Sequence, residues 1–270
     1  MLAEFERPPL VEVAASVQFP ELGAFHVAHL GALWLEFRDQ YPTVQQHHPL
    51  DQVVEQFDRP RRARSGLTVT SAMPVPRLWF VNESGAQIVQ VQSDRLVVNW
   101  KRVRGADAYP RYEGIKSEFE RVFGIATSFF EAHNLDAPQP SQVELTYVNA
   151  LVSDNGDAGT KDWLHKVLTN WADGSSDATD VELEEVTLRS QSVLMVSGAP
   201  AGRLYVDVSP GVAAVDGKKT YMLSLTVRGA PKSPTLAGAT EFLDFAHRVV
   251  IDAFLRVTTE AAHFSWGRQS

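Results

Sequence analysis

The chain has 270 residues, of which 44% are hydrophobic and 21% charged, so it is globular rather than disordered and long enough for two small domains or one duplicated domain. It contains no Cys, which excludes disulfides and Cys-ligated metal sites, and its net charge of −8 argues against a surface that binds nucleic acid throughout. The sequence has no apolar run of about 18 residues, and charged residues occupy the stretch from Met1 to Arg7 where a signal peptide would be apolar. We therefore expect a cytoplasmic protein that does not bind a membrane.

The first elements predicted are a strand and a helix. β-branched and apolar residues predict a strand of about ten residues that begins at Leu10, and Pro20 ends it. Apolar residues then recur at helical spacing from Leu22 to Phe37, which predicts a helix. The stretch from Tyr41 to Gly66 is rich in Gln, His, Pro and Arg, so we expect a long connection with one short helix around Leu50 to Phe57.

Further strands and a long helix complete the first half. Strands are predicted from Leu67 to Met73 and from Arg77 to Val81, followed by a β-hairpin from Gln87 to Arg104 that turns at Ser93-Asp94. Tyr109-Pro110 then begins a helix whose apolar residues repeat at steps of three and four. Asn134 ends this helix, and the Pro-rich stretch after it is the best candidate for a boundary.

A second pass through a similar order of elements begins at Ser141. It comprises a strand from Val143, a short helix from Thr160 to Trp171, a strand from Val181 to Val196, a hairpin of Arg203 to Val208 with Thr220 to Val227, and a helix after Ser233-Pro234.

The shared order of elements predicts an α+β fold with an internal duplication. Each unit reads strand, helix, antiparallel strands, long helix, with the first repeat in residues 1–140 and the second in residues 141–270, or both in one continuous duplicated domain. We expect a curved sheet that grips a long helix in each half, as in helix-grip or TATA-binding-protein-like folds. This analogy of fold carries no function.

Four motifs occur in a fixed order along most of the chain: PPLVEV at Pro8–Val13, QVQSDR with Asn99-Trp100 at Gln90–Trp100, YPRYE at Tyr109–Glu113 and ELTYVN at Glu144–Asn149. In this combination the sequence resembles a sporadically distributed family of bacterial proteins of unknown function. The resemblance implies a bacterial protein, but it implies no activity. Because patchy distribution is typical of mobile genes, it also suggests a context of phage defence or of toxin–antitoxin systems.

The motifs of common catalytic sites are missing from the sequence. The stretch from Gly211 to Thr220 has the wrong spacing for a phosphate-binding loop and predicts a hairpin turn, and the Gly-x-Ser-x-Gly motif of serine hydrolases does not occur. His26 and His29 lie one helical turn apart, but no carboxylate is spaced to complete a metal site. We therefore predict no catalytic residues, no metal and no cofactor, and favour a protein that is not an enzyme, although scattered acid and base residues would leave no motif.

A polar strand face in the hairpin is one candidate ligand site. Arg95 and Asn99 share a face of their strand, opposite Leu96 and Trp100. Either this face lines a pocket under a helix, together with Tyr112 and Tyr147, or it is the solvent side of the sheet. The solvent side is the simpler interpretation.

A basic stretch is the other candidate site. Residues 55–121 contain 12 Lys and Arg against 8 Asp and Glu. A site for phosphate or single-stranded nucleic acid would use the cations of the loop and of the hairpin end: Arg59, Arg61, Arg62, Arg64, Lys101, Arg102 and Arg104. A solvated loop beside strand ends explains the same charges, and the negative net charge favours that explanation.

These observations favour a non-enzymatic interaction protein of bacteria that acts through a protein partner or through self-association, because an open antiparallel sheet leaves unpaired edges. A protein with a small-molecule or nucleotide pocket, lined by Arg95, Asn99, Tyr112 and Tyr147, is the first alternative. Nucleic-acid binding through the loop from Arg59 to Arg64 is the second.

Overall fold

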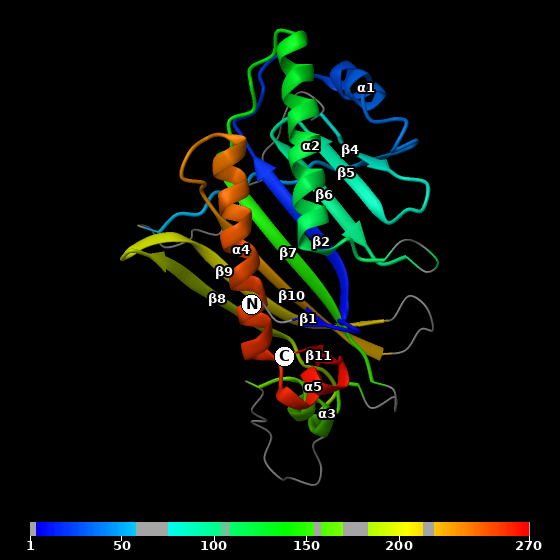
Figure 1. Cartoon of the computed structure of the whole chain (residues 1–270), viewed down its shortest axis with the longest axis vertical. Helices are drawn as coiled ribbons and strands as arrows, with labels where there is room; N and C mark the ends of the chain where they lie inside the picture. The colour runs from blue at the N-terminus through cyan, green and yellow to red at the C-terminus, as the bar shows by residue number, and fades with distance from the viewer. Residues whose placement is uncertain are drawn as a thin grey trace.

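The computed structural model describes residues 4–57, 75–103, 105, 108–153, 158–169, 183–212 and 219–269. They form a mixed α/β structure around one antiparallel sheet of nine strands, with two long helices on one face (Figure 1). In spatial order the strands are β3 (Thr43–His47), β4 (Arg77–Val81), β5 (Gln87–Gln92), β6 (Arg95–Lys101), β2 (Leu10–Gln18), β7 (Gln142–Leu151), β10 (Lys219–Gly229), β9 (Ala199–Val212) and β8 (Leu188–Val196).

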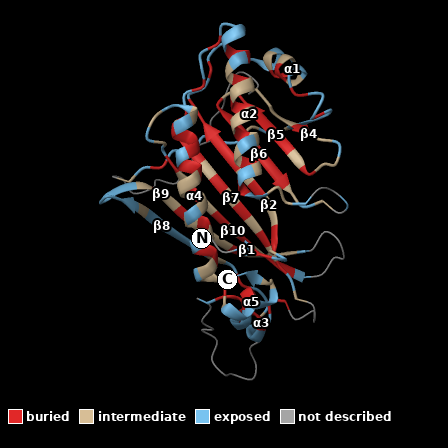
Figure 2. Ribbon diagram, in the orientation of Figure 1, coloured by how far each residue is buried: buried red, intermediate tan, exposed pale blue. Residues whose placement is uncertain are grey.

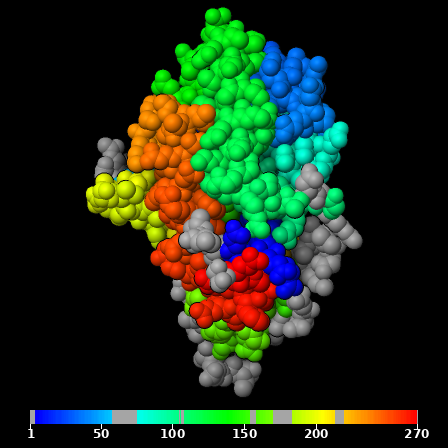
Figure 3. All heavy atoms as spheres, in the orientation of Figure 1, coloured from blue at the N-terminus to red at the C-terminus, as the bar shows by residue number. Residues whose placement is uncertain are grey.

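The described part of the chain contains five helices: α1 (Val27–Leu35), α2 (Arg111–Ala132), α3 (Lys161–Val167), α4 (Leu236–Val257) and α5 (Glu260–Ser265). The two long helices, α2 and α4, lie side by side over the sheet (Figure 3). Asn134 follows α2 with a φ of 55°, a left-handed conformation that ends helices and that Asn tolerates, as the sequence predicts. None of the described helices combines the length and the apolar composition that crossing a membrane requires.

The two faces of the sheet differ in chemistry because side chains alternate along each strand. The face under α2 and α4 is apolar and carries Val13, Leu145 and Leu225, each of which is 0% exposed. The four central strands β6, β2, β7 and β10 are therefore mostly buried in Figure 2, whereas the edge strand β8 is mostly exposed. The opposite face carries the polar residues of the same strands, among them Gln18 and Glu144.

The pattern of α2 accounts for its position. Phe119, Phe123 and Phe130 are at most 6% exposed and fall on its sheet-facing side, as the helical spacing predicts. Burial of each ring contributes on the order of 2 kcal/mol to the free energy of unfolding. The predicted hairpin is also confirmed, since β5 and β6 pair from Gln87 opposite Trp100 to Gln92 opposite Arg95.

Other predictions about elements need correction. The stretch from Tyr41 to Gly66 contains strand β3, which the sequence analysis missed. Its residues 48–57 belong to no helix or strand, so the helix predicted around Leu50 to Phe57 is wrong. Side chains of the sheet bind the backbone of this segment and so replace the hydrogen bonds that a helix would form. β8 begins at Leu188 rather than at Val181, and the strand predicted from Leu67 to Met73 lies outside the described residues.

The two ends of the described chain pair with each other. β1 (Glu4–Phe5) is antiparallel to β11 (Arg268–Gln269), and both lie beside the lower end of α4 in Figure 1. Phe5 contacts the ring of Phe254 edge-on, with 5.6 Å between the ring centroids. Pairs of two residues leave no periodic pattern, which is why the sequence analysis did not find them.

The central strand β7 should be sensitive to loss of side-chain volume. We expect Leu145→Ala to lower the free energy of unfolding by about 2 to 5 kcal/mol, because the side chain is fully buried and leaves a cavity. Urea unfolding measures the change. Val44→Ala on the edge strand β3, where the side chain is 42% exposed, is the control and should shift stability by no more than about 0.5 kcal/mol. Equal effects of the two substitutions would contradict this assignment of the core.

Candidate ligand pocket

A cavity of about 310 Å³ lies between α4, the first turn of α2, β7 and the N-terminal segment. Apolar side chains from the N-terminal segment through the start of β2, from β10 and from α4 form much of its wall: Phe5, Pro8, Pro9, Leu10, Leu225, Val250, Ile251 and Phe254. Ligand pockets in proteins are typically apolar with a few placed polar groups, and this volume falls at the small end of their range.

A chain of hydrogen bonds joins three polar residues of the wall. The Tyr109 and Tyr147 hydroxyls lie 3.2 Å apart, and the Tyr147 hydroxyl lies 3.0 Å from Nδ1 of His247. The three residues come from the segment before α2, from β7 and from α4. The tertiary fold therefore gathers side chains that are 38 and 100 residues apart in sequence into one polar group.

Tyr112 connects this group to the contact between the two long helices. Its ring stacks on the imidazole of His247, with centroids 4.0 Å apart and an angle of 6° between the planes. Its hydroxyl donates to Oδ1 of Asp244 at 2.7 Å, and Lys116 binds both carboxylate oxygens of Asp244 at 2.9 and 2.8 Å. Burial alone would raise the pKa of Asp244, but the hydrogen bonds from Lys116 and Tyr112 outweigh it and lower that pKa.

Burial keeps the polar groups of the wall uncharged. It lowers the pKa of His247 to about 4, with Arg248 acting in the same direction and Asp244 against it. Burial likewise raises the pKa of Tyr109 to about 12 and raises that of Tyr147 well above its usual value. At neutral pH the cavity therefore presents phenol groups and a neutral imidazole.

The start of α2 has an unusual backbone that places Tyr109 and Tyr112 on either side of a sharp bend. Arg111 has a φ of 63°, a left-handed conformation that costs a residue other than Gly about 1 kcal/mol or more. Gly114 packs against Pro110 so closely that a Cβ atom there would lie 2.8 Å from the proline ring. Arg111, Glu4 and Glu113 all line the cavity and are all exposed. The charged residues of the wall therefore lie at the mouth of the cavity.

The structure brings two of the four predicted ligand residues together and separates the other two from them. Tyr112 and Tyr147 both line the cavity and both contact His247. Arg95 and Asn99 lie on the opposite face of the sheet, where they are 8% and 3% exposed, so that they belong neither to the cavity under the helices nor to the open solvent side.

The residues proposed for nucleic-acid binding are described only in part. Arg102 donates a hydrogen bond to the carbonyl oxygen of Pro8 at 3.0 Å, and Lys101 is half-buried at the end of β6. Arg59, Arg61, Arg62, Arg64 and Arg104 lie outside the described residues.

His247 and Tyr109 are the cavity residues that the sequence analysis missed. A signal for His247 exists, because it falls within the apolar stripe of α4 beside Leu243 and Val250, where a polar residue needs a buried partner. Tyr109 carries no such signal, since its position depends on the bend at Arg111.

His26 and His29, considered above as metal ligands, lie with their ring centroids 3.9 Å apart at the start of α1. Within the described ranges no group of three or more His, Asp and Glu side chains is arranged to hold a metal ion.

Comparison of the chain with protein-family models, with curated proteins and with solved structures gave no match.

The lowered pKa of His247 predicts how stability depends on pH. Between the ordinary imidazole pKa of 6.5 and the folded value of about 4, the unfolded chain binds a proton that the folded chain does not. The contribution of His247 to the free energy of unfolding is therefore fully present above pH 6.5, and it falls by on the order of 3 kcal/mol as the pH decreases to 4. We expect His247→Phe, which keeps a ring against Tyr112, to unfold with a shallower pH dependence.

Urea unfolding at several values between pH 4 and 7 measures this slope for the wild type and the variant. His48→Phe, at an exposed histidine, is the matched control and should keep the wild-type slope. A slope that His247→Phe leaves unchanged would mean that the imidazole titrates normally in the folded protein.

Proposed function

We propose that the protein binds a small, planar, mostly apolar molecule in the cavity between α2, α4 and β7. The observation that carries this proposal is the hydrogen-bonded group of Tyr109, Tyr147 and His247 beside the apolar residues of the wall. Phenol and imidazole groups donate and accept hydrogen bonds without charge, so they suit a hydroxyl, carbonyl or ring nitrogen on the ligand.

The charges around the cavity argue for an uncharged ligand or one with a single carboxylate. Arg111 is the only cation among the described residues that line the cavity, and it lies at the mouth with Glu4 and Glu113. Several cations commonly bind the phosphates of a nucleotide, whereas the described wall of this cavity has one cation and two carboxylates. A helix start can also bind phosphate, but Glu113 lies in the first turn of α2 and opposes an anion there. We therefore favour a small metabolite with one or two rings over a nucleotide.

Binding without chemical conversion is the simplest role for this set of side chains. The described lining residues include no Ser, Thr, Lys or Asp, and their two carboxylates, Glu4 and Glu113, are exposed at the mouth of the cavity. A general base works best with a pKa near the working pH, whereas that of His247 is about 4. Binding is therefore the role that we propose for this cavity.

The proposal predicts that filling the cavity abolishes binding. Ile251→Trp adds a large side chain at a lining position of α4, while Val249→Trp makes a comparable change on the same helix at a residue that does not line the cavity. A panel of phenols, indoles and aromatic carboxylates should contain members that stabilise the wild type and Val249→Trp but not Ile251→Trp. At a ligand concentration of 100 times Kd the gain is about 2.7 kcal/mol.

Thermal unfolding with and without each compound measures this gain, after circular dichroism has established that both variants are folded. A panel without any stabilising compound, or equal stabilisation of Ile251→Trp, would argue against the cavity as a binding site.

We further propose that the chain is an internal duplication with a helix-grip or TATA-binding-protein-like arrangement. Counted outward from the centre of the sheet, one half has the order β2, β6, β5, β4, β3 and the other has β7, β10, β9, β8, so among the described residues the first half has one more strand at its edge. In each half the strand that comes first in the chain, β2 or β7, lies at the centre of the sheet. The strand that comes last in the chain, β6 or β10, pairs with it. The long helices α2 and α4 follow those last strands and cover the same face, which supports two units related by the pairing of β2 with β7.

A second candidate function is self-association through the edge strand β8. Within the described residues β8 pairs only with β9, so the other side of its backbone has no strand partner. Val193, Met195 and Val196 are 46%, 57% and 40% exposed, and the strand has no charge from Ser190 to its end. Natural edge strands usually carry charged residues that oppose the addition of another strand, and β8 has none from Ser190 onward. A second copy of β8 would pair with this edge in the antiparallel direction.

A lysine on this edge should prevent the pairing. We expect the wild type to sediment as a dimer and Val193→Lys as a monomer, because a charge on an edge strand opposes strand addition. Val212→Lys, at a valine of β9 that is 70% exposed, is the matched control and should remain a dimer. Sedimentation velocity measures the masses, and a wild type that is monomeric at high concentration would exclude this candidate.

The remaining alternatives stay predictions. Nucleic-acid binding depends on the arginines of residues 59–64, and the family resemblance suggests phage defence or toxin–antitoxin systems as a context for either candidate function.

A further inference from the structure

Four polar side chains form one row across the sheet on the face opposite the helices. Gln92 of β5 lies opposite Arg95 of β6, Arg95 opposite Gln18 of β2, and Gln18 opposite Gln142 of β7. Directly opposed residues of neighbouring strands project to the same face, so these side chains stand next to one another. All four residues are at most 8% exposed.

The extended segment of residues 48–57, which follows β3, lies across this row and is bound through its backbone. The amide of Gln92 contacts both the N–H and the carbonyl oxygen of Leu50, at 2.9 and 3.0 Å. The amide of Gln18 contacts the same two groups of Val53, at 2.9 and 3.1 Å. This two-point pattern repeats after three residues. Gln92 and Gln18 are two strands apart, about 10 Å, which is the length of three residues of extended chain.

Further backbone contacts continue the pattern. Arg95 donates to the carbonyl oxygen of Asp51 at 2.8 Å, and the amide oxygen of Gln142 accepts from the N–H of Glu55 at 3.2 Å. Contacts of this kind do not depend on the side chains of the bound segment. The row therefore forms a surface that can hold an extended chain of varied sequence.

Most side chains of the segment are directed away from the sheet. Leu50 and Val54 are 39% and 51% exposed, so the segment buries little apolar surface against the sheet. Glu55 is the exception, because its side chain is only 1% exposed. The segment is thus held by its backbone, by the Glu55 carboxylate and by the amide of Gln52, which donates to the carbonyl oxygen of Phe19 at 3.1 Å. The guanidinium of Arg203 also lies over the ring of Phe57, 4.7 Å from its centroid.

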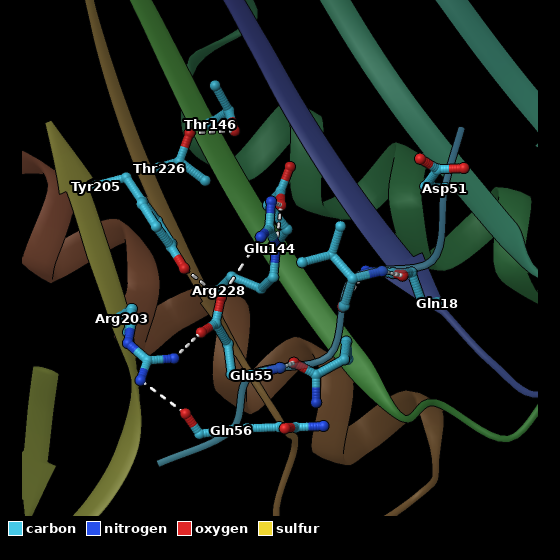
Figure 4. Close-up of polar contacts among 12 residues, drawn as sticks. Gln18, Asp51, Glu55, Gln56, Glu144, Thr146, Arg203, Tyr205, Thr226 and Arg228 are labelled. Carbon is cyan, nitrogen blue, oxygen red and sulfur yellow. Dashed lines mark hydrogen bonds and ion pairs between the residues drawn. The ribbon is translucent and has the colours of Figure 1, made fainter. Parts of the chain in front are cut away.

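The site of the Glu55 carboxylate is built from charged and polar residues of β9 and β10. The carboxylate accepts from Tyr205 at 2.5 Å, pairs with Arg203, and lies 3.4 Å from Arg228, which also pairs with Glu144 (Figure 4). The Arg203 and Arg228 side chains are only 14% and 16% exposed. Two largely buried guanidinium groups are costly without enough negative charge, so this site requires an anion in addition to Glu144.

We propose that this face is a recognition surface for an extended segment of a partner protein that carries an acidic residue, and that residues 48–57 occupy it as an internal ligand. The spacing of the contacts defines the partner segment: a residue bound by Gln92, a residue three positions later bound by Gln18, and a carboxylate two positions after that between Arg203 and Tyr205. Recognition by backbone contacts plus one anchoring side chain is a common mode of peptide binding. This surface is separate from the cavity and does not depend on a ligand there.

The internal segment competes with a partner peptide for the surface. Because it is tethered to β3, its effective concentration at the row is in the millimolar range typical of short connections. A partner peptide of moderate affinity will therefore compete poorly with the wild-type chain. Weakening the internal anchor should open the surface.

The test uses the full-length chain with Glu55→Gln and a fluorescent peptide with the sequence of residues 48–57. We expect this variant to bind the peptide at least about ten-fold more tightly than the wild type, since a hydrogen bond between charged groups is worth more than 1.4 kcal/mol. A peptide with Gln in place of the glutamate should bind about ten-fold more weakly. Fluorescence anisotropy measures both affinities.

Two further variants separate recognition from loosening of the structure. Asp51→Asn removes an exposed carboxylate from the same segment. Arg95 contacts the backbone carbonyl of Asp51 and not its carboxylate, so this variant should bind the peptide as weakly as the wild type does. Adding Gln18→Leu to Glu55→Gln should remove binding, because it deletes the two-point contact. Equal affinity for both peptides, or no binding by a folded Glu55→Gln chain, would overturn the proposal, and a cross-linked dimer with exchanged segments would assign the surface to a second copy.

Discussion

The antiparallel pairing of β2 with β7 is the contact on which the rest of the structure depends. It joins the two halves of the chain in one sheet, and it fixes which face of each strand meets the helices. Because paired residues project to the same face, the pairing aligns Val17 with Val143 under the helices and Gln18 with Gln142 on the other side. A register shift of one residue would exchange these faces and would remove both the core and the polar row.

The same strands therefore support two sites of different chemistry. On β7, Tyr147 projects into the cavity beside α4, whereas Glu144 faces the region of the internal segment. The cavity excludes charge through burial, and the opposite face concentrates charge in paired form. A protein that binds a small molecule on one face and an extended segment on the other would have its two sites separated by the thickness of one sheet.

Local periodicity predicted the central hairpin and the long helix α2, because their buried residues repeat along contiguous sequence. The sequence also suggested that Tyr112 and Tyr147 line a pocket with Arg95 and Asn99. The structure places the two tyrosines against His247, without Arg95 and Asn99. It gave no basis for the extended conformation of residues 48–57, which long-range contacts with β2, β5 and β7 determine. The surroundings of Arg95 and Asn99 could not be predicted, because the sequence does not tell which face of β6 the helices cover.

The position of β2 and β7 at the centre of the sheet has a consequence for how the protein unfolds. The first strand of each half contributes its apolar residues to a core that α2 and α4 share, and these helices are joined by Tyr112, Lys116 and Asp244. Neither half can open without exposing the central strand of the other. The sheet should therefore behave as one cooperative unit in hydrogen exchange, with the slowest amides in β2 and β7 and the fastest at the edges.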